Sequence, residues 1–379
     1  MRVLTINSGS SSIKSKLFDN QNETLSILIE KIGKENAQIT IDYMGTIEQK
    51  QLSIVSHSSG FEVMQEVIKS YGIDLIERVG HRVVHGGDIF VEPTLLDDIV
   101  IAQIEAISHL APLHNPSNLL GITIARSTYP KAQHFAIFDT AFHQSMPAHA
   151  YRYAIKTSYY ENDKIRRYGF HGSSHSYIAK EFARLSDLNN PNLITIHLGN
   201  GASICAIKEG KSIDTSMGFT PLEGLVMGSR SGDLDPSIAL FIAQKYDLSF
   251  NQIDNVLNKQ SGLKGICDYN DMRDVIAASI SGNRDASLAI DIFCYRIKKY
   301  IGAYLAVIGQ IDGVIFTGGI GEHSPLIRER VMQDMGHLNL SIDKNKNNQN
   351  QQWIEESGIK IAIIPTNEEL EMARLVLAL

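Results

Sequence analysis

The sequence predicts an α/β protein made of two related halves. Short apolar strands alternate along the chain with helical segments, a pattern typical of α/β folds. Loops of glycine and small polar residues follow several strands, at the ends where open α/β sheets bind ligands. A strand followed by such a loop occurs near the start of each half, which indicates an internal duplication.

The predicted strands are short apolar runs. The run 3–6 breaks at a Ser/Gly loop over 7–12 and resumes over 13–18. In the second run Ile13 and Leu17 alternate with Lys14 and Lys16, so the two runs are predicted to form a β-hairpin. Further strands are predicted at 78–84, 135–138, 193–197, 314–316 and 361–364.

Three helix starts carry capping signals. Asp235 and Ser324 each precede a proline, which suits an N-cap followed by the first helical position. Thr366 and Glu369 have the spacing of a capping box before an apolar run, and this last helix, 369–379, is expected to pack back on the first domain. The polar stretch 344–352 is predicted to be a solvated surface loop without chemistry.

The internal repeat sets the expected domains. The segments 5–9 and 195–199 both follow an apolar strand, and both lead into small residues. We therefore expect domain I over 1–140 plus 367–379, and a nucleotide-binding domain II over 141–366.

Composition excludes several classes of function. The chain has 379 residues, of which 43% are hydrophobic and 20% charged, with a net charge of −7. No basic excess is available for a nucleic acid or a membrane surface, and no run approaches the roughly 18 apolar residues of a spanning helix. Three scattered cysteines fit no metal spacing and suit free thiols in a reducing cytoplasm.

Three loops have the residues of a phosphate-binding loop, in which small side chains let backbone N–H groups approach the anion. They lie at 7–12, 199–203 and 318–321. None is followed by the Lys-Ser/Thr pair of a Walker loop, and none has the dinucleotide fingerprint, so a dehydrogenase is excluded. Together they favour a nucleotide polyphosphate held from two sides.

Several polar residues stand where a ligand is expected. Arg82 and Arg230 lie among Gly and Ser residues, and a guanidinium there matches carboxylate or phosphate oxygens. His171 precedes a helix, where it can donate to an anion, and His114 has a weaker case. Asp139 ends a strand. With Asn7 and Glu368 it offers oxygen ligands to Mg²⁺, partly through water.

Nine motifs then make a family resemblance plain. In order they are NSGSSSIK (7–14), GHRVVHGG (80–87), APLHNP (111–116), FDTAFH (138–143), YGFHGSSH (168–175), HLGNGAS (197–203), MGSRSGDLDP (227–236), TGGIGE (317–322) and PTNEE (365–369). The sequence resembles the acetate kinase family over essentially the whole chain. The resemblance implies two duplicated actin/hexokinase-like (ribonuclease H-like) α/β domains flanking a nucleotide cleft, and it implies a homodimer.

The resemblance also implies roles for individual residues. The catalytic set is His171, Arg230, Arg82 and Asp139. The substrate set is Arg82, Val84, Leu113, His114, Phe170 and Pro221, with the apolar members around the acyl methyl group. The metal set is Asn7, Glu368 and Asp139. The nucleotide set is Ser12, Lys14, His197, Leu198, Gly199, Asn200, Gly201, Asp271, Met272, Arg273, Gly319, Ile320, Gly321, Glu322 and His323. His323 departs from the asparagine usual in the family.

The expected activity is reversible, direct in-line phosphoryl transfer from ATP to acetate, giving acetyl phosphate and ADP in the cytoplasm. Mg²⁺ is the expected metal, with Mn²⁺ as an alternative. A propionate- or butyrate-directed carboxylate kinase is the nearest alternative. A nucleotide switch of the actin or Hsp70 kind is a third, which the two arginines and the apolar acyl residues disfavour.

Overall fold

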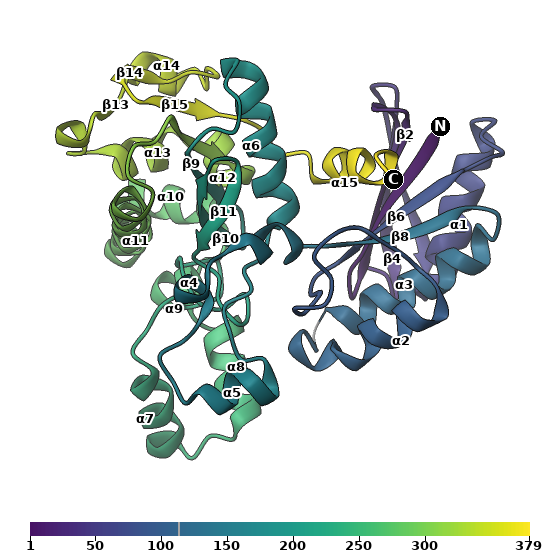
Figure 1. Ribbon diagram of the computed structural model, residues 1–379, viewed down its shortest axis with the longest axis horizontal. Coiled ribbons are helices and arrows are strands. Elements are labelled where there is room, and N and C mark those ends of the chain that lie inside the picture. Colours follow the sequence, from purple (N-terminus) through teal and green to yellow (C-terminus); the bar gives the residue numbers. More distant parts are fainter. Residues whose placement is uncertain (113) are drawn as a thin grey trace. The chain divides into compact units, whose positions relative to one another are not determined.

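The chain folds into two units, each with its own β-sheet. A computed structural model describes residues 1–112 and 114–379 (Figure 1). Unit 1 comprises Met1–Gln144 and Asn367–Leu379, and unit 2 comprises Ser145–Thr366. Leu113, one of the residues expected at the acyl group, lies outside the described residues. No helix in the described part of the chain is long and apolar enough to cross a membrane.

Unit 1 is built on an eight-stranded mixed sheet in the order β5-β4-β3-β2-β1-β6-β8-β7. The strands are β1 (Arg2–Ser8), β2 (Ser12–Asp19), β3 (Asn22–Glu30), β4 (Lys34–Tyr43), β5 (Thr46–Ile54), β6 (Arg78–Val83), β7 (Thr94–Leu95) and β8 (Gln133–Phe138). The predicted hairpin is confirmed, because β1 pairs antiparallel with β2 and Asn7 lies opposite Lys14.

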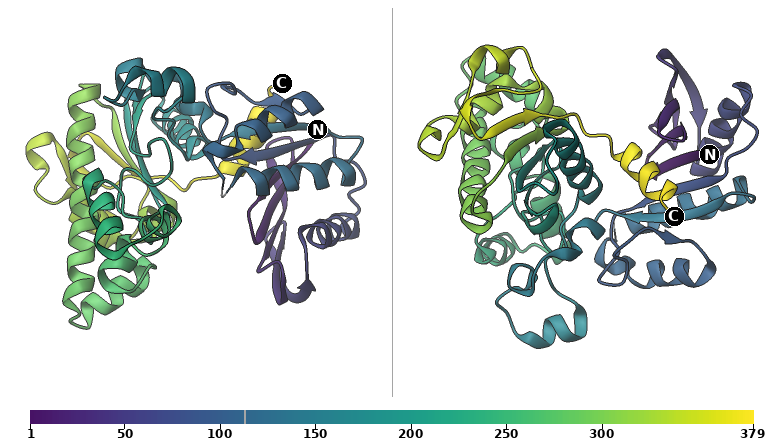
Figure 2. Two further views of the ribbon diagram at one scale, coloured as in Figure 1. Left: turned by 90° about the horizontal axis from the view of Figure 1, so that it is seen from below. Right: turned by 45° about the horizontal axis from the view of Figure 1, so that its top comes forward.

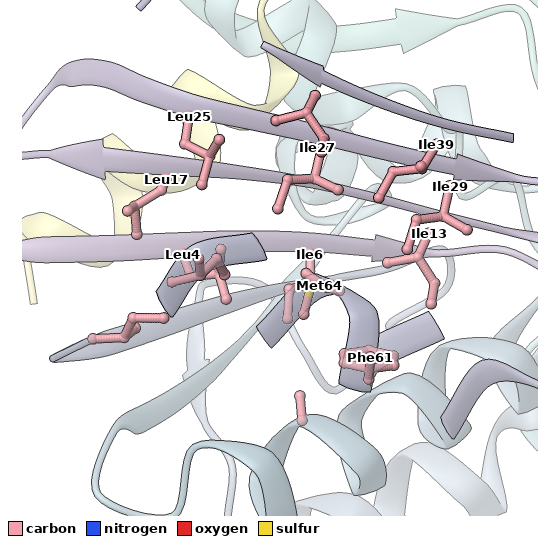
Figure 3. Packing of buried hydrophobic residues seen from close by; sticks show 14 of the residues in the cluster. Leu4, Ile6, Ile13, Leu17, Leu25, Ile27, Ile29, Ile39, Phe61 and Met64 are labelled. Carbon is pink, nitrogen blue, oxygen red and sulfur yellow. The ribbon is translucent and has the colours of Figure 1, made fainter. Parts of the chain in front are cut away.

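The helices of unit 1 are α1 (His57–Ser70), α2 (Asp98–Ala106), α3 (Asn115–Thr128) and α15 (Glu368–Leu377). Alternating Ile and Leu residues on β1 to β4 meet Phe61 and Met64 of α1 in a dry cluster (Figure 3). The last helix packs back on this unit, as expected. Met372 and Val376 of α15 contact Val3 and Phe135, and both figures show α15 beside β1 (Figures 1 and 2).

Unit 2 has a five-stranded sheet in the order β11-β10-β9-β12-β15. Its strands are β9 (Leu193–Leu198), β10 (Ala202–Lys208), β11 (Lys211–Thr215), β12 (Gly313–Thr317) and β15 (Lys360–Ile363), with a separate ribbon of β13 (Leu340–Ile342) and β14 (Glu355–Gly358). Its helices are α4 (Ala148–Tyr151), α5 (Thr157–Asp163), α6 (Gly172–Ser186), α7 (Pro236–Tyr246), α8 (Phe250–Lys259), α9 (Gly262–Cys267), α10 (Met272–Ile280), α11 (Arg284–Ile308), α12 (Gly318–His323), α13 (Pro325–Met332) and α14 (Lys344–Asn348).

The two sheets share one topology, which confirms the predicted duplication. In unit 1, β1 pairs antiparallel with β2 and parallel with β6, which in turn pairs parallel with β8. In unit 2, β9 pairs antiparallel with β10 and parallel with β12, which pairs parallel with β15. The order β3-β2-β1-β6-β8 therefore corresponds to β11-β10-β9-β12-β15. The two glycine loops expected to bind phosphate join equivalent strands.

One of the three predicted helix starts differs from expectation. Asp235 caps α7 through its bond from the Ser237 N–H. Ser324 is the N-cap residue of α13, with Pro325 at the first helical position as predicted, although its side chain makes no cap bond. The capping box at Thr366 is wrong: Asn367 caps α15 by accepting from the Leu370 N–H at 3.1 Å. The Thr366 hydroxyl is instead bonded to Ser174 at 2.8 Å, so tertiary contacts outweigh the local signal.

The prediction for 344–352 is also wrong. Residues Lys344–Asn348 form the short helix α14, capped by Asp343, and Asn347 within it is fully buried. A polar residue is buried at low cost where its hydrogen bonds are satisfied. Arg328 supplies those bonds to Asn347.

Candidate active site

In unit 1, an arginine and three carboxylates meet near the carboxyl ends of β6 and β8. Arg82 lies on β6, and Asp139 follows the last residue of β8. Nε and Nη2 of Arg82 donate to the two carboxylate oxygens of Asp139 at 2.9 and 2.6 Å, a bidentate pair. Burial opposes the charge on Arg82, but the pair with Asp139 outweighs it and raises the pKa of the guanidinium.

The first turn of α15 adds two carboxylates with opposite titration behaviour. Burial is the largest cause that raises the pKa of Glu368; with the charges of Asp139 and Glu369, and against those of Arg82 and Lys14, the net result is a pKa of about 7. Glu369 is buried too, which opposes ionisation. Its ion pair with Lys14 at 2.6 Å outweighs that effect and lowers its pKa. Lys14 is therefore engaged by a carboxylate within this unit.

Two buried asparagines of α3 hold the loop that follows Arg82. Asn118 accepts from the Val84 N–H at 3.1 Å and donates to the Ser8 carbonyl at 2.9 Å. Asn115 accepts from the His85 N–H at 3.1 Å and donates to the His85 carbonyl. Neither asparagine stands out in the sequence, because an Asn near a helix start is normally interpreted as a cap. Val84 itself is buried, with 7% exposed.

In unit 2, His171 stands at the N-terminus of α6. It is the N-cap residue and has φ +56°, in the left-handed region, which His adopts more readily than most residues. Its Nδ1 lies 2.9 Å from the Ser203 hydroxyl, which also lies 2.9 Å from Nε2 of His175. Because one hydroxyl has one hydrogen, at least one of the two imidazoles donates to Ser203. The ring of His171 stacks on that of His197 at 4.4 Å.

Arg230 and His171 approach the same glycine of the β9–β10 loop. A Cβ at Gly201 would lie 2.7 Å from Nη2 of Arg230 and 3.6 Å from Nε2 of His171. A side chain at this position would require the Arg230 guanidinium to shift. Nη1 of Arg230 donates to the Pro221 carbonyl at 2.7 Å, and no carboxylate of the described chain forms a salt bridge with it. Burial lowers the pKa of Arg230, and within the described residues this guanidinium is a cation without a counter-ion.

A cavity of about 470 Å³ opens beside this loop within unit 2. Its lining joins the β9–β10 loop, the start of α10 and helix α12: Gly199, Asn200, Asn270, Asp271, Met272, Arg273, Ile276, Gly319, Ile320, His323 and Ser324. Asp271 caps α10, and the hydrogen bonds from Arg273 lower its pKa to about 2. The cavity has the mixed apolar and polar lining of a small-molecule site.

Comparisons with known proteins agree with this geometry. The chain matches the model of the acetokinase family over residues 2–374. It is 50% identical over 390 residues to an acetate kinase of Halothermothrix orenii and 46% identical over 386 residues to one of Campylobacter lari, in each case across 99% of this chain and 98% of the relative.

The chain belongs to the acetokinase family.

Solved structures support the same assignment. A propionate kinase from Francisella tularensis matches with a TM-score of 0.97 and 40% identity, covering 100% of this chain and 99% of that one. An acetate kinase of Porphyromonas gingivalis matches with a TM-score of 0.93 and 38% identity, covering 100% of this chain and 99% of that one. The predicted duplicated α/β fold of the actin/hexokinase type is thus confirmed, and this acetokinase has it in both units.

The structure gathers many of the predicted nucleotide residues and separates others. The cavity is lined by Gly199, Asn200, Asp271, Met272, Arg273, Gly319, Ile320 and His323. His197, Leu198, Gly201, Gly321 and Glu322 do not line it. The Glu322 carboxylate accepts from the Gly318 N–H at 2.8 Å and from the Thr366 N–H at 3.2 Å. Its side chain therefore binds the backbone at the start of α12 and before α15. Ser12 and Lys14 lie in unit 1.

The remaining predicted residues are found in both units. His114 precedes α3 and is exposed, whereas Phe170, just before His171, is 2% exposed. The carbonyl of Pro221 accepts a hydrogen bond from Arg230. Asn7 is half-buried on β1. Sequence reasoning assigned no role to the side chains of Ser203 and Asn118, which bond to His171 and to the backbone of Val84, or to Asn115, which bonds to the backbone of the next residue, His85. No spacing along the chain reveals such pairs.

Proposed function

We propose that this acetokinase catalyses reversible, Mg²⁺-dependent transfer of the γ-phosphoryl group of ATP directly to acetate, giving acetyl phosphate and ADP. The observation that carries the proposal is the placement of Arg230 and His171 over Gly201, next to the cavity. Phosphoryl transfer passes through a loose transition state with charge on its equatorial oxygens. A guanidinium without a counter-ion and an imidazole at a helix N-terminus stabilise such charge.

The proposal assigns the nucleotide to unit 2. Its purine would occupy the cavity near Met272, Ile276 and Ile320, and its phosphates would lie along the β9–β10 loop. Glycines at 199 and 201 let backbone N–H groups approach an anion closely. The cation of Arg230 then compensates the negative charge of the phosphates, which repays the free energy of burying it unpaired.

The proposal assigns the acceptor carboxylate and the metal to unit 1. Asn7, Asp139 and Glu368 offer oxygen atoms, which Mg²⁺ prefers. Among described residues no group of three or more His, Cys, Asp or Glu side chains is arranged to hold a metal, and both oxygens of Asp139 already accept from Arg82. These residues therefore fit a hydrated Mg²⁺, contacted partly through water.

The raised pKa of Glu368 supports this metal assignment. Three carboxylates lie near two cationic side chains, so Glu368 is poorly compensated until a further positive charge arrives. When bound, Mg²⁺ would neutralise charge on the phosphates during transfer. Mn²⁺ prefers the same oxygen ligands and would replace it.

Acetate needs no general base, because it is already ionised at neutral pH. The chain must therefore orient the two anions and stabilise the charge on the transferred group. In the proposed mechanism Arg82 orients the carboxylate, Asp139 fixes Arg82, and Arg230 and His171 hold the phosphoryl oxygens. Isolation of a kinetically competent phosphorylated enzyme would exclude direct in-line transfer.

Propionate is the second candidate acceptor, because a propionate kinase is 40% identical to this chain. Val84, Phe170 and Pro221 are the proposed apolar contacts of the acyl group, with Leu113. One methylene changes selectivity by only about 1–3 kcal/mol, so propionate and then butyrate are expected to be poorer substrates. An actin- or Hsp70-like switch would turn over ATP without regard to acetate.

We also propose a cytoplasmic homodimer. The three cysteines are free and buried, as suits a reducing compartment. Leu240 and Phe241 on α7 and Phe250 on α8 are 71%, 63% and 94% exposed, and such apolar patches commonly mark protein interfaces. Light scattering of the wild type and of Phe250→Asp tests this proposal. A wild-type monomer would contradict it.

A hydroxamate assay tests the proposed activity. The purified chain is incubated with ATP and Mg²⁺, or with GTP, in the presence of acetate, propionate or butyrate. We expect most acyl hydroxamate with acetate and ATP, and none without metal. A preference for propionate would show that propionate, not acetate, is the main acceptor. ATP hydrolysis at the same rate with and without a carboxylic acid substrate would favour the nucleotide switch.

A further inference from the structure

A buried arginine of unit 2 stands behind one wall of the nucleotide cavity. Arg328 on α13 is fully buried, although arginine is rarely buried without a partner. No carboxylate in the described part of the chain pairs with it, and burial lowers its pKa to about 10. All its contacts are instead hydrogen bonds to neutral oxygens.

Every N–H group of this guanidinium is directed at an acceptor. Nη1 donates to the Gly321 and Glu322 carbonyls at 2.8 and 3.0 Å. Nε and Nη2 donate to the side-chain and main-chain oxygens of Asn347 at 2.8 and 2.9 Å, and Nη2 also donates to Oδ1 of Asn350 at 2.6 Å. One side chain thus joins the end of α12 to the polar segment 347–350.

The acceptors on α12 explain why this position matters for a ligand. The last carbonyls of a helix have no partner within the helix, and Arg328 satisfies two of them. Gly319, Ile320 and His323 of the same helix, with Ser324 after it, form a wall of the cavity. Asn347 holds the next turn as well, because its Nδ2 donates to the Pro325 carbonyl at 2.9 Å.

Packing alone does not explain the choice of arginine. An apolar side chain of similar volume fills a buried space without the cost of an unpaired charge. The guanidinium provides five donors in a fixed plane, which define the position of α12 in a way that apolar contacts do not.

We propose that Arg328 is a positioning residue for nucleotide binding, which acts with Asn347 and Asn350 by fixing α12 against the cavity. The proposal rests on the proposed role of this cavity as the nucleotide site. It gives the polar segment 344–352 a function: this segment supplies three of the five acceptors. Arg328 touches no reacting atom.

Two variants test the proposal, with binding of ADP measured by calorimetry. Arg328→Lys keeps the charge but cannot reach both α12 and Asn347, so we expect the Kd for ADP and the KM for ATP to rise about tenfold. Asn350→Gly removes one acceptor from an exposed residue whose backbone is left-handed (φ +49°), a conformation that glycine adopts without strain, so misfolding is not expected. This variant should raise both constants about threefold. In each variant the KM for acetate should stay within twofold of wild type.

The matched control is Arg330→Lys. Arg330 lies on the same helix but is partly exposed and paired with Asp291, and among the described residues no hydrogen bond or ion pair joins it to α12 or Asn347. We expect the ADP affinity of the Arg330→Lys variant to equal that of wild type. If Asn350→Gly leaves both nucleotide constants unchanged, or if Arg328→Lys raises the constants for ATP and acetate equally, the proposal is wrong.

The same measurements separate this proposal from the proposed function. Wild-type chain that binds ADP but phosphorylates no carboxylate would contradict the proposed reaction and leave the test of Arg328 intact. Wild-type chain that fails to bind ADP at all would overturn both, because Arg328 would then have no nucleotide site to position.

Discussion

The two units share a strand order but hold their arginines in opposite ways. In unit 1, Arg82 is paired bidentately with Asp139, and two further carboxylates begin α15. In unit 2, Arg230 is bonded to a carbonyl, and its neighbours are His171 and glycine loops. Duplication therefore supplied the scaffold, but the two arginines stand at non-equivalent places on it: Arg82 lies on β6, which corresponds to β12, whereas Arg230 lies between β11 and α7. A neutralised arginine suits orientation of an acceptor, whereas an uncompensated one suits binding of phosphates.

Replacing Arg230 should have the largest effect. Arg230→Met removes a cation that no carboxylate neutralises, so we expect kcat to fall roughly 10³-fold or more, as for other arginines at phosphoryl transfer. The melting temperature should hold or rise, because the cost of burying an unpaired charge disappears. Steady-state kinetics and calorimetry check both outcomes. A kcat close to that of wild type would show that the uncompensated charge of Arg230 has no role in the transfer, and it would contradict the contrast drawn between the two arginines.

Replacing Arg82 should reduce stability as well as activity. Arg82→Met leaves Asp139, 1% exposed, without its partner, and we expect a loss of about 2–4 kcal/mol in the free energy of unfolding. The double variant Arg82→Met/Asp139→Asn is the control and should recover much of that loss without recovering activity. Equal unfolding free energies in the single variant and in wild type would show that the pair does not stabilise unit 1.

The adjacent carboxylates of α15 should respond oppositely to neutralisation. The folded-state pKa of Glu368 is raised to about 7, so stability is lost as the pH rises from the unfolded-state pKa, about 4.3, through that value. Without metal, Glu368→Gln should add about 1–3 kcal/mol at pH 8 and nothing at about pH 4 or below, where the carboxyl is protonated in both the folded and the unfolded chain. Urea unfolding at the two pH values measures this.

The companion variant is Glu369→Gln. Its pKa is lowered by the pair with Lys14, so the stability it contributes is present at pH 8 and is lost as the pH falls through the lowered value. We expect about 1 kcal/mol less stability at pH 8. Equal responses of the two variants would show that the neighbouring charges do not set these pKa values.

The smallest effect concerns acyl selectivity. Val84→Ala shortens a buried side chain on the loop held by Asn118, and we expect the ratio of kcat/KM for propionate over acetate to rise about fivefold. Competition of the two acids in one assay measures this ratio. An unchanged ratio would show that Val84 does not contact the acyl group.

The sequence by itself determined four strands of the first sheet (β1, β2, β6 and β8) and three of the second (β9, β12 and β15), the duplication and the residues of the glycine loops; it did not reveal the other strands, such as β3 to β5. These features depend on local patterns: apolar alternation, and small residues where the backbone must approach a ligand. The tertiary structure decided which charges meet. Only folding pairs Arg82 with Asp139, leaves Arg230 with a carbonyl, and separates the pKa values of the neighbours Glu368 and Glu369.

The same distinction explains the sequence predictions that were wrong. Thr366 carries a strong local capping signal, but its hydroxyl bonds to Ser174, far away in the chain. The composition of 344–352 is typical of solvated coil, yet Asn347 is buried and accepts a hydrogen bond from the guanidinium of Arg328. Hydrogen bonds and charge pairs between distant segments depend on three-dimensional proximity, which polarity along a short window does not encode.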